Sequence, residues 1–187
     1  MRALVREGAA DPLVRDHARA IAAAHPHLHP VEAVFAHTQS LPYEYDEAIL
    51  ARMGDDGGTS ELLQGASLQV ARELALGRGA VPGDCDDRAL YLNAHLEALG
   101  YPTGFLLVRG PGRRDFSHVY SAVRGEAGWV PLDPIFNGEG GRPRFRAGEE
   151  VGALEGARDR TLVPVADGGS GALLALALLA AIGLWRR

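Results

Sequence analysis

Residues 83–87 read Gly-Asp-Cys-Asp-Asp and contain the single cysteine of this 187-residue chain. Asp84 is a favourable N-cap, so Cys85 is predicted to open an α-helix. A thiol in the first helical turn lies at the positive end of the helix dipole, which favours the nucleophilic thiolate. The flanking aspartates oppose the thiolate by charge repulsion. We therefore expect Cys85 to need a cationic partner before it can attack a carbonyl carbon.

Two segments after this helix carry the residues that can complete such a site. Residues 116–123 and 128–134 have the composition of β-strands joined by a short turn, and they contain His118 and Asp133. On neighbouring strands these two side chains can lie side by side. The predicted roles are a Cys85 nucleophile, a His118 general base and an Asp133 that holds the imidazole tautomer.

The order of these motifs resembles the transglutaminase-like branch of the papain-like thiol enzymes. The motifs are Gly-Asp-Cys-Asp-Asp before a helix, then Ser-His-Val-Tyr, then Gly-Trp-Val-Pro-Leu-Asp-Pro, and the likeness covers roughly residues 31–136. In this form it is similar to domains of bacterial and bacteriophage proteins. The resemblance implies a Cys85, His118 and Asp133 triad, with no metal and no other cofactor. It also implies an α+β fold in which the catalytic helix packs on a small antiparallel sheet.

Acyl transfer needs hydrogen-bond donors for the developing oxyanion. The backbone N–H of Cys85 is one candidate, but no glutamine stands shortly before it, as one does in papain-like enzymes. We name Gln64 and Tyr45 as weaker candidates for the oxyanion site or the substrate cleft. Tyr45 lies in a segment that resembles the tyrosine-bearing stretch before the catalytic helix, although an ordinary half-buried tyrosine is an equal alternative. Arg88 is expected to form a surface ion pair with Asp84, in preference to binding a substrate carboxylate.

Composition excludes several other classes of protein. The net charge of −5 argues against nucleic acid as a partner, because phosphate binding needs a basic surface. One cysteine excludes an internal disulfide. His25, His27 and His29 are interleaved with two prolines, so we interpret them as an inter-helix loop and predict no metal site. The first ten residues lack the features of a secretory signal, which predicts a cytoplasmic domain.

Periodicity predicts the remaining elements of an α+β domain. Helices are expected from Pro12, from Pro30, over residues 61–76 and from Cys85 to just before Gly100. In the last of these, Cys85 should share an apolar face, with polar residues on the other side. A strand is expected over residues 103–108, and Trp129 should anchor the sheet to the helix. The expected apolar positions after Cys85 are Ala89, Leu92, Leu96 and Leu99, and the expected polar ones are Asp86, Asn93 and Glu97.

The predicted organisation is a transglutaminase-like domain over residues 1–147, a linker over 148–170 and a hydrophobic C-terminal tail over 171–187. Residues 1–147 are expected to fold without the tail. The apolar run Ala172 to Trp185 would rise only about 22 Å as a helix, against a hydrocarbon core of roughly 30 Å. We predict that it attaches the domain to a membrane. The alternative is a helix buried in an oligomer or against the domain.

The functional prediction is a cysteine-dependent enzyme that cleaves or transfers an amide of a peptide or protein through a covalent acyl-enzyme. The alternative is a catalytically inactive binding or phage-structural module that keeps the same fold. Thiol reactivity separates the two hypotheses. A thiolate paired with His118 should react with iodoacetamide near pH 6 far faster than free cysteine does.

Overall fold

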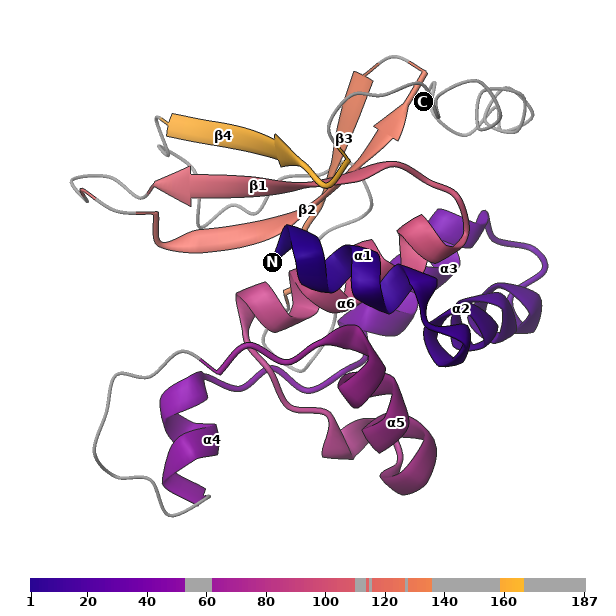
Figure 1. Ribbon diagram of the computed structural model, residues 1–187, viewed down its shortest axis with the longest axis horizontal. Coiled ribbons are helices and arrows are strands. Elements are labelled where there is room, and N and C mark those ends of the chain that lie inside the picture. Colours follow the sequence, from indigo (N-terminus) through magenta and orange to yellow (C-terminus); the bar gives the residue numbers. More distant parts are fainter. Residues whose placement is uncertain (53–61, 110–113, 115, 127, 136–158, 167–187) are drawn as a thin grey trace.

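The computed structural model describes residues 1–52, 62–109, 114, 116–126, 128–135 and 159–166. In this part of the chain, helices come first and an antiparallel sheet follows, as expected for an α+β domain (Figure 1). The elements are α1 Arg2–Ala10, α2 Pro12–Ala24, α3 Pro30–Gln39, α4 Asp46–Arg52, α5 Ala66–Leu76, the 3-10 helix η1 Arg78–Ala80, α6 Cys85–Ala98, β1 Thr103–Arg109, β2 His118–Gly125, β3 Gly128–Leu132 and β4 Asp159–Pro164.

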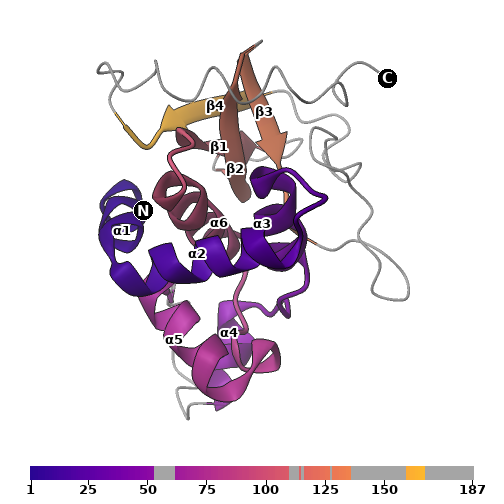
Figure 2. The ribbon, with the colours of Figure 1, turned by 90° about the vertical axis from the view of Figure 1, so that its right-hand side faces the viewer.

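The sheet has the strand order β3-β2-β1-β4, and all of its neighbouring strands are antiparallel. One face of the sheet packs on α6, while α1, α2, α3 and α5 surround the other sides of that helix (Figures 1 and 2). Because side chains alternate along a strand, Val119, Ser121 and Val123 of β2 share the face toward α6. The hydroxyl of Ser121 donates to the carbonyl of Ala89 on α6.

The central helix α6 is buried on nearly all sides, which differs from the predicted amphipathic helix. The expected apolar positions Ala89, Leu92 and Leu96 are indeed fully buried. Asn93, expected on an exposed face, is also buried and donates to the carbonyl of Gly104 on β1. A second stripe along α6, spaced by three and four residues, is polar and faces other helices. This stripe consists of Asp84, Asp87, Arg88, Tyr91 and His95.

Most helix boundaries follow from local capping. The carboxylate of Asp11 accepts from the amide of Leu13, and Pro12 occupies the first turn of α2. His29 caps α3 in a capping box with Glu32, so this histidine of the proline-rich loop has a structural role. The chain leaves α6 through Gly100, whose φ of 89° is readily adopted only by glycine.

Three predicted elements differ from the structure. Residues 62–65 are not helical, and α5 begins only at Ala66. Trp129 does not join the core between sheet and helix; its ring lies 5.9 Å from the guanidinium carbon of Arg124, its cross-strand partner. Residues 159–164, assigned to a linker, form β4 and pair with β1. The domain therefore includes these residues, and a chain cut at 147 would lose an edge strand.

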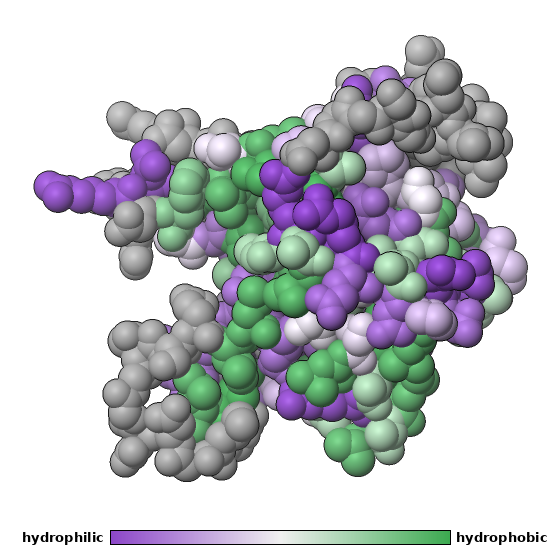
Figure 3. Space-filling model, in the orientation of Figure 1, coloured by the Kyte–Doolittle hydropathy of each residue, from purple (hydrophilic) through white to green (hydrophobic). Residues whose placement is uncertain are grey.

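The predicted tail over residues 171–187, including Ala172 to Trp185, lies outside the described residues. Within the described part, no helix has both the length and the apolar character needed to cross a bilayer. Apolar side chains do reach the surface of α5, where Figure 3 shows a hydrophobic area. They belong to Leu68, Leu74 and Leu76, the last being 73% exposed.

Candidate functional site

Gly83, just before α6, packs so closely on the first turn of the helix that only glycine fits there. Gly83 forms an isolated parallel bridge with Tyr43, and its carbonyl accepts from the amide of Glu44. A Cβ atom at Gly83 would lie 2.7 Å from Oδ2 of Asp87, well inside van der Waals contact. As predicted, Asp84 is the N-cap and accepts from the amide of Asp86. These contacts fix where Cys85 enters the fold.

The Cys85 thiol lies in a partly buried position against β2. Its sulfur accepts a hydrogen bond from the backbone N–H of Val119. Burial raises the pKa of Cys85 to about 12, and the charges of Asp84, Asp86 and Asp133 act in the same direction. The helix dipole does not overcome these effects. The resting sulfur is a protonated thiol, so any nucleophilic role needs a base that removes the proton as attack proceeds.

His118, at the start of β2, and Asp133, just after β3, lie together, as the sequence predicts. Ser121 pairs with Leu132, which places Asp133 just past the end of β3 and diagonal to His118. Nε2 of His118 lies 2.7 Å from Oδ2 of the buried Asp133. The other oxygen, Oδ1, accepts from the amide of Ile135 at 3.1 Å. With Nε2 engaged, Nδ1 has no hydrogen-bond partner among the described residues and is available for proton exchange.

Cys85 and His118 both lie near the start of β2. The sulfur meets the strand at the amide of Val119, which directly follows His118. The imidazole lies beside the ring of Tyr120, with the two ring centroids 5.5 Å apart. Among the described contacts the sulfur and the imidazole share no hydrogen bond. A direct Cys85–His118 contact therefore remains a prediction.

Tyr43, not Tyr45, is the tyrosine beside the sulfur. Burial raises the pKa of Tyr43, and the charges of Cys85, Asp84 and Asp133 raise it further, which places its phenol within electrostatic reach of these groups. Tyr45 is 64% exposed and packs edge-on against the ring of Tyr43. The sequence placed a pair of tyrosines in this segment, and residues two positions apart on an extended segment lie on the same side. It did not show which of them faces inward.

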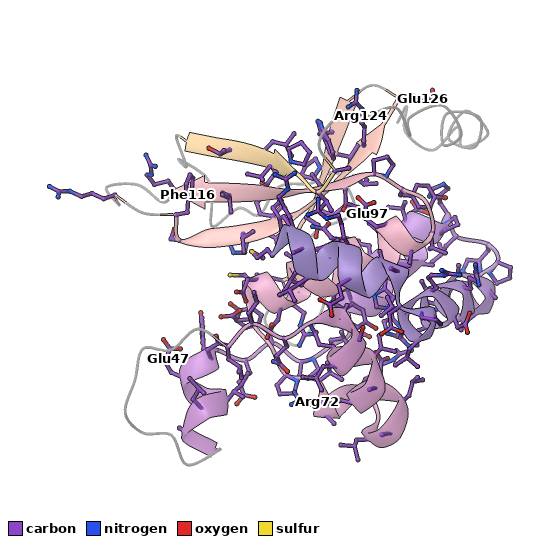
Figure 4. The ribbon with its side chains drawn as sticks, in the orientation of Figure 1. Glu47, Arg72, Glu97, Phe116, Arg124 and Glu126 are labelled. Carbon is purple, nitrogen blue, oxygen red and sulfur yellow. The ribbon has the colours of Figure 1, made fainter. Side chains whose placement is uncertain are left out.

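Gln64 lies beneath the helix start in a network of internal hydrogen bonds. Its backbone N–H donates to Oδ1 of Asp87 at 2.6 Å, and its side-chain Nε2 donates to Oδ2 of Asp87 and to the carbonyl of Pro82. Its oxygen Oε1 accepts from Arg72, which projects from α5 (Figure 4). Both hydrogens of the amide nitrogen are thus engaged. We assign Gln64 to the support of α6 and do not carry it forward as an oxyanion donor.

Arg88 is buried, contrary to the predicted surface ion pair with Asp84. Its side chain is only 2% exposed, and its guanidinium donates to the carbonyls of Pro42 and Val81 and to Oε1 of Gln69. Desolvation lowers its pKa to about 10, so it stays charged near neutral pH. Arg88 therefore ties two loops and α5 to the start of α6. It is not placed to meet a substrate carboxylate.

A group of carboxylates surrounds the same helix start. Oxygen atoms of Asp46, Asp84 and Asp87 lie within 4.8 Å of one another. Burial raises the pKa of Asp84 to about 7, and its interaction with the carboxyl of Asp86 adds to this. Burial also raises the pKa of Asp87 to about 7. Because Asp87 already accepts two hydrogen bonds from Gln64, its oxygens are committed to the fold.

Comparisons with known proteins do not place the chain in a family. No family model, no curated protein and no solved structure matches it.

Proposed function

We propose that this protein is a thiol enzyme that cleaves or transfers the acyl group of a peptide or protein amide, with Cys85 as nucleophile, His118 as base and Asp133 as the orienting carboxylate. The main support is that the cysteine at the start of α6 and the hydrogen-bonded pair of His118 and Asp133 both lie near the start of β2. The transglutaminase-like motif order in the sequence supports the same assignment.

In the proposed reaction, His118 Nδ1 takes the thiol proton while Sγ of Cys85 bonds to the acyl carbon. The tetrahedral adduct collapses when the C–N bond breaks, and the imidazolium returns its proton to the departing amine. Water or a second amine then attacks the thioester, with His118 again accepting the proton. The S–C bond breaks, and the thiol regains a proton from the imidazolium. Asp133 accepts a hydrogen bond from Nε2–H and holds the imidazole in this tautomer.

The raised pKa of Cys85 makes this a general-base mechanism rather than one that starts from a resting thiolate–imidazolium pair. A side-chain rotation that brings Sγ and Nδ1 together is part of the proposal. Backbone N–H of Cys85 and the phenol of Tyr43 are the proposed oxyanion donors. Tyr43 is chosen over Tyr45 because its phenol lies within electrostatic reach of the sulfur.

An activated acyl ester, followed by intact-protein mass spectrometry and hydroxylamine release of the hydroxamate, tests the proposal. Wild type should gain one acyl group and release it to hydroxylamine. Cys85→Ala should gain none while keeping its fold, since a small apolar residue suits this position. His118→Gln should acylate at least a hundredfold more slowly. An equal acylation rate in Cys85→Ala would refute the cysteine mechanism.

The second candidate is an inactive module that retains the fold for binding or assembly. Two observations favour it: burial raises the pKa of the thiol, and the thiol shares no hydrogen bond with His118 among the described contacts. The pH profile of iodoacetamide alkylation separates the two. In the enzyme, the thiol should react well below the pH at which it ionises alone, and the reaction should depend on His118. In the inactive module, wild type and His118→Gln should alkylate only in strongly alkaline solution, near the pKa of about 12, and at the same rate.

A further inference from the structure

A second buried polar group lies on the helical side of α6, away from Cys85. His17 of α2, His37 of α3 and Glu73 of α5 converge, and their ligand atoms lie within 4.8 Å of one another. Tyr91 and His95 of α6 complete the group. Apart from the partly buried His17, all are at least nine-tenths buried. We call these five residues the histidine cluster.

A chain of hydrogen bonds fixes the protonation of two imidazoles in this cluster. Nδ1 of His95 lies 2.7 Å from the carbonyl oxygen of Tyr91, which can only accept, so this nitrogen carries the proton. The His95 ring is completely buried, which favours its neutral form. Its Nε2 is therefore an acceptor, and Nδ1 of His17, 3.0 Å away, must be the donor.

This relay leaves Nε2 of His17 as a bare lone pair in the centre of the cluster. That nitrogen lies 3.8 Å from Oε2 of Glu73. Two electron-rich atoms thus face each other in a buried space. Such an arrangement is unfavourable unless a cation lies between them.

His37 supplies an independent observation. It is only 6% exposed, and its Nε2 lies 2.8 Å from Oε1 of Glu73 but off the line of a hydrogen bond, so this buried nitrogen has no hydrogen-bond partner in the described part of the chain. Buried polar atoms of folded proteins rarely lack a partner. The nitrogen points into the same space as the lone pair of His17.

We propose that the histidine cluster binds a divalent transition metal of the zinc class through Nε2 of His17, Nε2 of His37 and one oxygen of Glu73. Two imidazoles and a carboxylate form a ligand set that Zn²⁺ accepts, usually with a fourth ligand such as water. Tetrahedral ligands at about 2.1 Å from zinc lie roughly 3.4 Å apart. The present N···O separations of 2.8 and 3.8 Å fall on either side of that value.

The surroundings of the three ligands have the form of a metal site. Tyr91 donates to Oε2 of Glu73 at 2.7 Å, and His95 accepts from His17, so two of the three ligands are held by further hydrogen bonds. The charged group facing the site is Arg78 of η1, whose Nε lies 3.6 Å from Oε1 of Glu73. Its side chain is 55% exposed, so it can turn toward solvent when a metal binds.

The metal would join α2, α3 and α5, three helices that no disulfide can link in a chain with one cysteine. This predicts a stabilising site, separate from the chemistry proposed for Cys85. It does not rest on the proposed function. Nitrogen ligands disfavour Ca²⁺ and Mg²⁺, which prefer all-oxygen sites.

The test is titration of metal-free, full-length protein with Zn²⁺ in competition with a chromogenic chelator, paired with thermal unfolding. Wild type should bind one equivalent and unfold at a higher temperature with zinc. His37→Gln and Glu73→Gln should bind at least a hundredfold more weakly. The matched control is His25→Ala/His27→Ala, which removes two histidines whose rings lie 6.1 Å apart but have no buried carboxylate beside them. This control should bind as wild type does.

Co²⁺ spectroscopy keeps the proposal testable if the ligand variants fail to fold. Wild type and Cys85→Ala should give the same d–d bands of a nitrogen and oxygen site, without sulfur-to-cobalt charge transfer. Absence of binding in wild type overturns the proposal. So does loss of binding in Cys85→Ala or in the loop control, because either result would place the metal elsewhere.

Discussion

The two polar groups along α6 are buried to a similar degree but ionise in opposite ways. At the helix start, Asp87 is fully buried and its pKa is raised to about 7. One turn further along α6, Tyr91 donates to Glu73 of α5, which is 7% exposed and has a pKa lowered to about 2. Both carboxyls suffer desolvation, which favours the neutral form. The difference must therefore come from their partners.

The histidine cluster contains a single carboxylate, that of Glu73, whereas several carboxylates lie together at the helix start. Glu73 faces imidazoles, the Tyr91 hydroxyl and the Arg78 guanidinium. At the helix start, Asp84, Asp86 and Asp87 lie within one turn, and Arg88 donates to carbonyl and amide oxygens. The ratio of donors to acids, more than depth of burial, sets the charge of each group. The proposed nucleophile lies at the end where negative charge is already disfavoured.

Of the substitutions considered, removal of the buried Arg88 guanidinium should change the free energy of unfolding most. Arg88→Met should lower the free energy of unfolding by about 3–5 kcal/mol, because three buried oxygen acceptors lose their donor. Urea unfolding measures it. The control is Arg72→Met, which removes only a part-buried hydrogen bond to Gln64 and should cost about 1 kcal/mol. Equal losses in the two variants would show that Arg88 does not anchor the helix start.

The sequence predicted those elements whose signals are local. Proline and aspartate caps gave α2, and the break at Gly100 gave the end of α6. The turn between two short strands was enough to predict that His118 and Asp133 are neighbours. Strand β4 was missed because its pairing with β1 spans some fifty residues, and a distant register has no local pattern.

The polar stripe of α6 could not be predicted for a different reason. A buried polar residue is recognised by its partners, and the partners of Tyr91 and His95 come from helices far away in sequence. By pattern alone, Arg88 was assigned to the surface for the same reason. The histidines of the proline-rich loop are close in sequence yet only one of them, His29, has a defined role, as a helix cap. Proximity in sequence was a poor guide to clustering here.

A smaller effect is expected at the proposed oxyanion site. Tyr43→Phe should slow acyl-enzyme formation about ten- to hundredfold, because one donor to the developing oxyanion is lost. Alkylation of Cys85 by iodoacetamide should be unchanged, since that reaction forms no oxyanion. Tyr45→Phe, at an exposed ring, is the matched control and should behave as wild type. If Tyr43→Phe slows both reactions equally, the phenol acts on the thiol and not on the oxyanion.

The smallest expected effect is on how the free energy of unfolding depends on pH, through Asp84 at the start of α6. The pKa of Asp84 is raised to about 7 from an ordinary 3.8, so the folded protein holds a proton that the unfolded chain has released between about pH 4 and 7. Stability from this group is therefore complete below pH 4 and is lost as the pH rises through 7. Asn at position 84 keeps the helix cap and can still donate to Asp86, but it carries no charge.

Asp84→Asn should consequently match wild type at pH 4 and exceed its free energy of unfolding at pH 8, by about 1–2 kcal/mol after allowance for solvent screening of a partly exposed group. The same substitution should bring Cys85 alkylation to lower pH, because Asp84 is one of the charges that raise the thiol pKa. Asp16→Asn, at an exposed carboxylate on α2, is the control and should shift stability by less than about 0.5 kcal/mol at either pH. A constant difference between Asp84→Asn and wild type from pH 4 to 8 would mean that this carboxyl does not titrate in that range, and the contrast with Glu73 would then rest on Asp87 alone.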